Sequence, residues 1–329
     1  MRTLLPVSVP VVDIAPLVRG GDASACARAI DDACRESGFF SIVGHGVDAD
    51  IVHELDRLAR EFFERDDEEK AAIAMARGGR AWRGWFPVGG ELTSGVPDRK
   101  EGIYFGAELG ADHRRVVART PMHGANLFPA HPSGLRGVVL RYMAEMERVA
   151  QAVLVGVARG LGLAPSFFAD GLTADPLVLF RVFRYPPAPV DDDGWGVAEH
   201  TDYGLLTVLA QDGSGGLEVR TPDGWTAIAP VPGAFVCNLG DMLERLTGGL
   251  YRSTPHRVRN TSGASRLSFP FFLDPSWDAA VERLPIVARP DDDASAADRW
   301  DHASVHGFTG TYGDYITGKV ARVFPQLMS

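Results

Sequence analysis

The sequence predicts a protein of the α+β class, mainly β in its second half, in which N-terminal helices buttress a C-terminal jelly roll. Helical patterns of apolar residues fill much of the first half, whereas after Asp175 short apolar runs alternate with turns rich in Gly, Asp and Pro. The chain has 329 residues, of which 45% are apolar, so it can bury a sizeable core. We expect a single unit over 1–329, with an N-terminal helix and strand region at 1–120, the jelly-roll core at 175–280 and a helical segment at 281–329.

Apolar periodicity predicts the elements of the first half. Helices are expected over 22–37, 49–65 and 133–161, and strands over 9–14 and 39–43. The second helix illustrates the pattern, because its apolar residues recur every three or four positions, at Ile51, Leu55, Leu58 and Phe62.

Seven short strands are predicted for the second half, with a hairpin-like spacing that indicates an antiparallel sandwich or barrel. Their ranges are 177–185, 205–210, 216–220, 225–229, 234–238, 255–259 and 266–273. Near the C-terminus, TYGDYITGKVARVF within 300–329 has a helical pattern. We expect this last segment to line the entrance of a site in the jelly roll.

Residues 77–106 are rich in Gly, Trp and Pro, a composition that predicts an irregular segment. Such a segment either lies over a site as a mobile cover or forms a plain surface loop. Its side chains Trp82, Arg83, Trp85 and Phe86 are expected to form either a wall against a substrate or a hydrophobic plug on the barrel rim.

Charge and composition exclude several classes of partner. With 33 Lys and Arg against 43 Asp and Glu, the net charge is −10, which disfavours binding to nucleic acid and to anionic membranes. No apolar stretch approaches the 18 residues of a membrane span, and the N-terminal residues do not resemble a signal peptide. The three cysteines have no metal-binding spacing and are expected to be buried thiols. We therefore expect a cytoplasmic protein whose partner is a small molecule.

Three residues form a candidate metal site. His200 and Asp202 stand two positions apart before an apolar strand, so on an extended chain their side chains would share one face. His256 lies in a later strand. Two histidines and one carboxylate make the facial triad of non-haem Fe(II) oxygenases, which leaves coordination positions open. A zinc hydrolase site uses similar ligands, and a purely structural role for the three residues is a further alternative.

Arg266 and Ser268 separate these alternatives. They alternate onto one face of a predicted strand, which should be the face that carries the metal ligands. A buried guanidinium needs a partner, and its fork suits a carboxylate held in bidentate fashion. A zinc hydrolase has no need of this arrangement, whereas a cosubstrate with one end on iron and a distal carboxylate does.

With these residues in place, the chain resembles the isopenicillin N synthase-like branch of the 2-oxoglutarate- and Fe(II)-dependent oxygenases. The resemblance covers nearly the whole chain. Its segments occur in the family's order: VPVVDIAPL, CRESGFFSIVGHGV, PDRKEGIYFG, FRVFRYPP, HTDYGLLTVLAQD, GGLEV, GDMLERLTGGLYRSTPHRV and RLSFPFFLDP.

The resemblance implies a double-stranded β-helix core and assigns roles by position. His200, Asp202 and His256 would bind Fe(II). Arg266 and Ser268 would bind the distal carboxylate of 2-oxoglutarate, and Tyr185, in RYPP, would join them. Because residues two apart on a strand share a face, Arg181 should point inward with Tyr185. Arg181 is then expected either to reach the substrate or cosubstrate or to pair with an internal acid.

The resemblance also implies the reaction. Conversion of 2-oxoglutarate to succinate and CO2 with O2 would drive hydroxylation, desaturation or cyclisation of a small molecule, and stimulation by ascorbate fits the same chemistry. Arg83, Arg181 and Arg184 favour a carboxylate-bearing substrate, such as an amino acid or an acid of secondary metabolism. Arg83 and Trp85 are accordingly candidate substrate contacts beside Arg181.

Two alternatives stay open. An isopenicillin N synthase-type Fe(II) oxidase keeps an Arg-x-Ser motif but directs it to a substrate carboxylate and does not use 2-oxoglutarate. A cupin-like metal-binding sensor without turnover would share the jelly roll. It is disfavoured because the three candidate ligands occur together with the carboxylate clamp.

Overall fold

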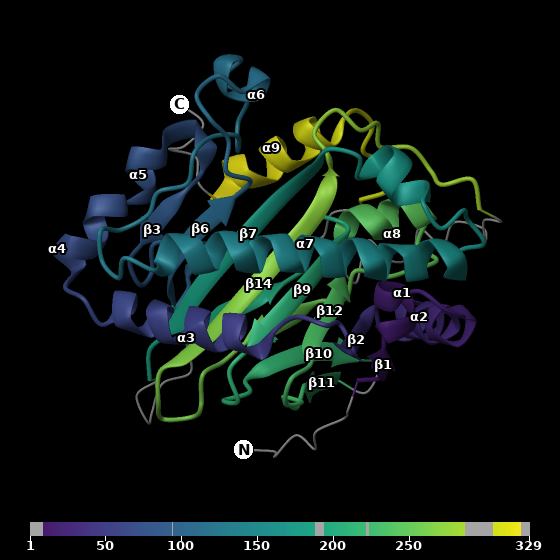
Figure 1. The fold of residues 1–329 in the computed structure, drawn as a ribbon, viewed down its shortest axis with the longest axis horizontal. Helices are drawn as coiled ribbons and strands as arrows, with labels where there is room; N and C mark the ends of the chain where they lie inside the picture. Colours follow the sequence, from purple (N-terminus) through teal and green to yellow (C-terminus); the bar gives the residue numbers. More distant parts are fainter. Residues whose placement is uncertain (1–8, 94, 188–193, 222–223, 287–304, 324–329) are drawn as a thin grey trace.

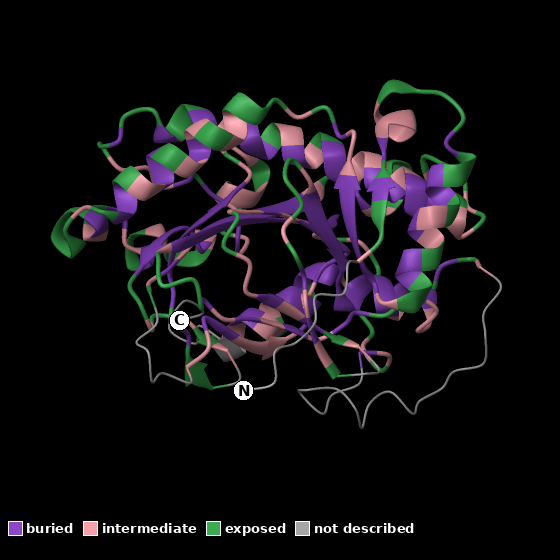
Figure 2. Ribbon diagram, turned by 90° about the horizontal axis from the view of Figure 1, so that it is seen from below, coloured by how far each residue is buried: buried purple, intermediate pink, exposed green. Residues whose placement is uncertain are grey.

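Two β-sheets face each other at the centre of the molecule, and helices cover the outer face of the larger one (Figure 1). The computed structural model describes residues 9–93, 95–187, 194–221, 224–286 and 305–323. Figure 2 shows that buried residues concentrate in the sheets and on the helix faces turned toward them. The jelly-roll core buttressed by N-terminal helices is thereby confirmed.

The larger sheet has eight strands in the order β1-β2-β12-β9-β14-β7-β6-β3. The pair β1 and β2 is parallel, and the remaining neighbours are antiparallel. Their bounds are β1 (Val11–Asp13), β2 (Phe39–Val43), β12 (Phe235–Leu239), β9 (Leu206–Gln211), β14 (Arg266–Ser276), β7 (Pro176–Tyr185), β6 (Glu101–Gly106) and β3 (Gly84–Phe86).

The smaller sheet has four antiparallel strands in the order β11-β10-β13-β8. They are β11 (Gly224–Ala227), β10 (Leu217–Thr221), β13 (His256–Val258) and β8 (Val197–His200). All seven strands predicted for the second half are confirmed to within a few residues. No strand was predicted at β8, because VAEH has too few apolar residues to show a strand pattern.

Three helices pack on and beside the larger sheet. They are α2 (Ser24–Glu36), α3 (Ala49–Phe63) and α7 (Leu135–Gly160), in agreement with the predicted ranges. In Figure 1, α7 crosses the sheet over β7, β14 and β9, and α2 and α3 lie against α7. The buried stripe of α7 includes Val139, Tyr142 and Val153, all 0% exposed, so burial of this apolar face holds α7 on the sheet.

Short elements complete the helical part. They are α1 (Ala15–Arg19), α4 (Asp67–Lys70), η1 (Ala71–Ile73), α5 (Met75–Gly78), η2 (Gly79–Ala81), α6 (Arg114–Val117), the π-helical η3 (Phe168–Leu172) and α8 (Asp241–Thr247). None of the helices that the structure describes is long and apolar enough to cross a membrane.

The expectation of an irregular cover over 77–106 was largely wrong. Within this range, β3 and β6 extend the larger sheet, and every residue of both strands is buried. The part that approaches the smaller sheet is the hairpin of β4 (Leu92–Thr93) and β5 (Val96–Pro97), which packs near β8. The Gly-rich composition did not reveal these strands. Their burial depends on distant parts of the chain, so it leaves no alternating apolar pattern in the local sequence.

The C-terminal helix is confirmed as α9 (Tyr312–Val323), which packs against β14. The remaining parts of the predicted 281–329 segment, 287–304 and 324–329, lie outside the described residues.

Strand register places the side chains that face the space between the sheets. On β7, Arg181 and Tyr185 share a face, and Arg266 of β14 lies directly opposite Tyr185. On the other side of β7, Tyr104 of β6 lies opposite Arg181. The inner face of the larger sheet therefore carries its polar residues in rows that run across neighbouring strands.

Candidate active site

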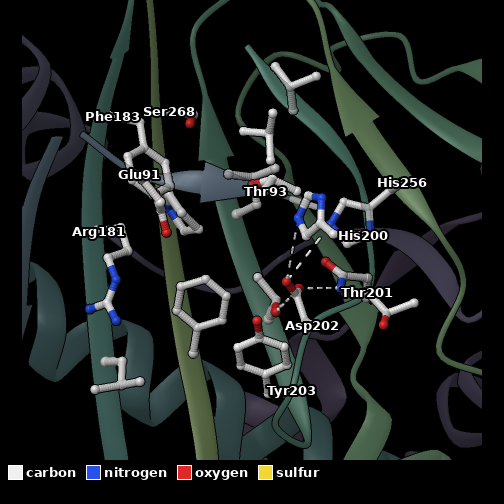
Figure 3. Close-up of a pocket in the computed structure, with 18 of the residues that line it drawn as sticks. Glu91, Thr93, Arg181, Phe183, His200, Thr201, Asp202, Tyr203, His256 and Ser268 are labelled. Carbon is white, nitrogen blue, oxygen red and sulfur yellow. Dashed lines mark hydrogen bonds and ion pairs between the residues drawn. The ribbon is translucent and has the colours of Figure 1, made fainter. Parts of the chain in front are cut away.

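A cavity between the two sheets gathers most of the residues singled out in the sequence (Figure 3). Its polar lining comes from both sheets and from the turn after β8. Apolar side chains, among them Leu179, Phe183 and Phe272, fill the space between the polar groups. Figure 3 shows Arg181 and Glu91 on one side of the cavity and the His200, Asp202 and His256 group on the other.

His200, Asp202 and His256 form the group of three metal-ligand residues that the described chain brings together. One ligand atom from each lies within 4.8 Å of the others. His200 ends β8, His256 begins β13, and the two are direct partners in the strand pairing. The His200 and His256 Nε2 atoms lie 4.0 and 3.8 Å from Asp202 Oδ1. Asp202 stands in the turn after β8, so it meets His200 through the course of this turn and not through the alternation of an extended strand.

Hydrogen bonds fix both imidazoles in the tautomer that a metal needs. His200 Nδ1 lies 2.8 Å from the carbonyl of Ala198, and His256 Nδ1 lies 3.2 Å from the carbonyl of Thr254. Because a carbonyl only accepts, each Nδ1 carries the hydrogen and each Nε2 keeps its lone pair. Burial lowers the pKa of both histidines, that of His256 to about 4, so both are neutral at physiological pH.

Asp202 is held by two donors behind it. Asn238 Nδ2 donates to Asp202 Oδ2 over 2.6 Å, and the Thr207 hydroxyl donates to the same oxygen. Burial opposes ionisation, but His256, His200 and these hydrogen bonds outweigh it and lower the pKa of Asp202. Oδ1 is thereby left to face the imidazoles as a carboxylate. Thr207 and Asn238 lie opposite each other on β9 and β12, and the sequence analysis gave neither this role.

Main-chain contacts position the turn that carries Asp202. The amide of Asp241, at the start of α8, donates to the Asp202 carbonyl over 2.7 Å, and the amide of Met242 donates to the carbonyl of Tyr203. Gly240 has to be glycine here, because a Cβ at that position would meet the Gly204 carbonyl oxygen at 2.4 Å.

Arg266 has the environment expected of a carboxylate clamp. It is buried, its Nε donates to the Gly215 carbonyl over 2.6 Å, and its Nη2 donates to Gln211 over 3.1 Å. Its Nη1 is buried without a partner among the described residues. The Ser268 hydroxyl lies 3.4 Å from the Tyr185 hydroxyl beside it. An unmatched buried donor next to two hydroxyls fits an anionic carboxylate, so these residues suit the distal end of 2-oxoglutarate.

The other candidate arginine, Arg181, lines the cavity. It is buried, and its Nη1 donates to the carbonyls of Phe105 and Phe180, each over 3.2 Å. The guanidinium carbon lies 3.5 Å from the ring centroid of Tyr104 and 4.7 Å from that of Trp82. No carboxylate of the described chain forms an ion pair with Arg181 within 4.0 Å, although the charges of Glu91 and Asp274 act on it from farther away and oppose the lowering of its pKa by burial.

Two predicted substrate contacts are wrong, because their side chains do not line the cavity. Arg83 donates to the carbonyls of Ala81 and Met122, each over 2.8 Å, and is a buried structural residue. Trp85 donates from Nε1 to Glu101 over 2.9 Å within the sheet. The cavity wall is instead completed by Trp82, Tyr104, Glu91 and Lys100. The last two were missed because charged residues in a Gly-rich segment have the pattern of a solvated loop.

Comparisons with known proteins agree with this geometry. Residues 9–131 match the family model described as non-haem dioxygenase in morphine synthesis N-terminal, and residues 175–275 match the 2OG-Fe(II) oxygenase superfamily. The chain is 44% identical to a "probable iron/ascorbate oxidoreductase" of Dictyostelium discoideum, over 91% of this chain and 89% of the relative.

Two further relatives are 34% identical. One is a 1-aminocyclopropane-1-carboxylate oxidase of Dictyostelium mucoroides, with 96% of this chain and 95% of the relative covered. The other is a homoarginine-6-hydroxylase of Glycine max, with 97% and 98% covered.

Solved structures agree as well. A putative 2OG-Fe(II) oxygenase family protein of Caulobacter crescentus has a TM-score of 0.78 at 27% identity, covering 95% of this chain and 98% of that one. The fold is also that of a full-length Neurospora crassa protein in complex with alpha-KG, with a TM-score of 0.79 at 23% identity, covering 95% and 96%. The chain therefore belongs to the isopenicillin N synthase-like family of 2-oxoglutarate- and Fe(II)-dependent oxygenases and is a dioxygenase that uses Fe(II), 2-oxoglutarate and O2.

Proposed function

We propose that this dioxygenase oxidises a carboxylate-bearing small molecule, and that Arg181 holds the substrate's acid group. In this proposal His200, Asp202 and His256 bind Fe(II), while Arg266, Ser268 and Tyr185 bind the distal carboxylate of 2-oxoglutarate. The observation that carries it is the state of Arg181, a buried guanidinium that lines the cavity without a carboxylate partner among the described residues.

The chain's own residues prepare the site for this reaction. When bound, iron and 2-oxoglutarate supply the oxidising chemistry, in which 2-oxoglutarate is converted to succinate and CO2 as O2 is consumed. His200 and His256 offer neutral Nε2 atoms because main-chain carbonyls accept from their Nδ1 atoms. Asn238 and Thr207 hold Oδ2 of Asp202, so its other oxygen would be left to bind the metal. Apolar side chains between these groups exclude water from the reacting atoms.

The position of Arg181 suits an acid on the substrate rather than on the cosubstrate. Arg181 is four residues from Tyr185 on β7, which is roughly 13 Å along a strand, so the two residues serve different parts of the cavity. A buried charge without an ionic partner is costly, and a substrate carboxylate would supply that partner. The named compounds of two relatives, 1-aminocyclopropane-1-carboxylate and homoarginine, both carry a carboxylate, which supports this substrate class.

The test is release of succinate and CO2 from labelled 2-oxoglutarate, screened against small carboxylic acids and amino acids. We expect turnover above the substrate-free rate with members of this panel and none with the corresponding amides or alcohols. Stimulation by neutral compounds alone would contradict the role of Arg181. Product formation at full rate without 2-oxoglutarate would instead indicate an oxidase of the isopenicillin N synthase kind.

A further inference from the structure

A buried cluster of three charged residues forms the cavity wall beside Arg181. Lys100 Nζ lies 2.8 Å from Glu91 Oε2 and also contacts the Asp98 carboxylate. Asp98 Oδ2 accepts from the Thr93 hydroxyl over 2.8 Å. Lys100 and Asp98 are each 2% exposed, so the cluster is internal and not a surface ion pair. Glu91 and Lys100 line the cavity directly.

Glu91 is the acidic group that this cluster presents to the cavity. The Tyr104 hydroxyl donates to its Oε1, and Lys100 Nζ lies 2.8 Å from its Oε2 in a charge-assisted contact. Burial opposes its ionisation, but Lys100, Tyr104 and Arg181 outweigh this and lower the pKa of Glu91. Because an ionised carboxylate has about four accepting sites, Glu91 can accept further hydrogen bonds beside those from Tyr104 and Lys100.

Tyr104 separates this carboxylate from the guanidinium of Arg181. Its hydroxyl donates to Glu91, and the face of its ring lies 3.5 Å from the Arg181 guanidinium carbon. A negative and a positive group thus stand on the same side of the cavity, one at the hydroxyl and the other against the ring face of the same tyrosine. Figure 3 shows both Glu91 and Arg181 across the cavity from the His200, Asp202 and His256 group.

The charges of this wall balance. Arg181 and Lys100 are cationic, and Glu91 and Asp98, which both form ion pairs with Lys100, are anionic. On the opposite side, an Fe(II) ion, doubly charged 2-oxoglutarate, Asp202 and Arg266 also sum to zero. Burial raises the pKa of Asp274, the remaining carboxyl group of the cavity, to about 7, so below that pH it is protonated and adds no charge to this balance. A substrate with a net charge would leave that charge uncompensated in a low-dielectric space.

We propose that the substrate is a zwitterion of zero net charge, with its acid group on Arg181 and its cationic group on Glu91. This deepens the proposed function and depends on it, because it assumes that the acid end is held as described there. A monocarboxylic acid would satisfy Arg181 but add an unbalanced negative charge beside Glu91. A simple amine would satisfy Glu91 but add an unbalanced positive charge beside Arg181.

Matched ligands test this directly on the intact protein loaded with Mn(II) and 2-oxoglutarate. L-Norleucine and 6-aminohexanoate are zwitterions with close and distant charges, and both become hexanoate without the amine and pentylamine without the acid. Phenylalanine, 3-phenylpropanoate and 2-phenylethylamine form an aromatic set. Binding is measured by calorimetry, and by the change that each ligand causes in the visible absorption band of the anaerobic Fe(II) and 2-oxoglutarate complex.

We expect at least one zwitterion to bind about tenfold or more tightly than both of its single-charge partners, since one added charge-assisted contact is worth about that factor. Glu91→Gln should move the preference toward the acids, and Arg181→Gln should move it toward the amines. Glu101→Gln, which changes a buried charge outside the cavity, should leave the preference unchanged.

The wild-type comparison needs no variant, so it stands even where a variant fails to fold. A panel in which no zwitterion binds more tightly than both of its partners overturns the inference. If acids bind as tightly as zwitterions, the proposed function survives and only the role of Glu91 is lost. If 2-oxoglutarate itself does not bind to the Mn(II)-loaded protein, the proposed function fails first.

Discussion

His200 and His256 face each other across the pairing of β8 and β13, with ring centroids 4.2 Å apart. The two imidazoles are thus placed by strand register, whereas Asp202 reaches them from the turn that follows β8. The histidines and the aspartate are thus positioned by different parts of the structure, and the two arrangements can be tested separately.

Replacement of a single histidine should abolish the metal site. His256→Gln removes one Nε2 ligand, and we expect a loss of Mn(II) affinity greater than the 10–100-fold typical of changes in outer partners. Calorimetric titration of the metal-free protein measures it. His45→Gln is the matched control, because His45 is also buried but bonds to the Gly233 carbonyl and to the Val47 amide. Equal losses in both variants would contradict the assignment.

The amide of Asn238 should matter through Asp202. Asn238→Ala removes the 2.6 Å hydrogen bond to Oδ2 and frees the carboxylate to rotate, so metal affinity should fall about 10–100-fold while the fold is kept. Asn126→Ala is the control, since Asn126 is a buried asparagine that bonds to Gly106 and Glu108 instead. An Asn238→Ala protein with wild-type affinity would show that strand packing alone orients Asp202.

The clamp prediction concerns 2-oxoglutarate alone. Arg266→Leu should raise the KM for 2-oxoglutarate by about 10–100-fold, because charge-assisted hydrogen bonds are worth roughly 1.5–3 kcal/mol and each 1.4 kcal/mol is about tenfold. Arg266→Lys should recover part of this loss, since an ammonium cannot form the bidentate fork. Initial rates at varied 2-oxoglutarate measure the effect, and Mn(II) affinity should stay unchanged. Unaltered KM in Arg266→Leu would remove the residue from the clamp.

Asp274 should make stability depend on pH. Burial raises its pKa to about 7, with the Tyr312 hydroxyl donating to it over 2.6 Å. Between its ordinary pKa and this value the folded state binds the proton more tightly than the unfolded state. The free energy of unfolding should therefore fall as pH rises, by about 2 kcal/mol from pH 5.5 to 7, and level off above. Urea unfolding of Asp274→Asn, which cannot ionise, should lack this slope. Parallel profiles for the variant and the wild type would contradict the prediction.

Much of the fold follows from local pattern, because strands of the jelly roll alternate apolar runs with turn residues. The metal ligands were also predictable, since chemistry restricts them to few residue types at a recognisable spacing. The local pattern could not predict which charged side chains are buried, because their burial depends on strands that are distant in the sequence. Arg83 and Arg181 look alike in the sequence, yet only Arg181 faces the cavity, because β6 and β14 fix the direction of β7. Glu91 and Lys100 are internal for the same reason.

The pairing of β7 on both sides has a consequence for how such an enzyme can change its substrate. Arg181 and Tyr185 sit on one rigid strand between β14 and β6, so this strand works as a fixed spacer of roughly 13 Å between two anchoring points. Because the first anchor is proposed for the substrate and the second for 2-oxoglutarate, the separation of the two bound acids cannot be changed by sliding either anchor, since a shift of one residue would turn the whole strand over. New specificities have to arise where the chain is not bound into the sheet, around the hairpin of β4 and β5 and along α9, whose Ile316 reaches the cavity.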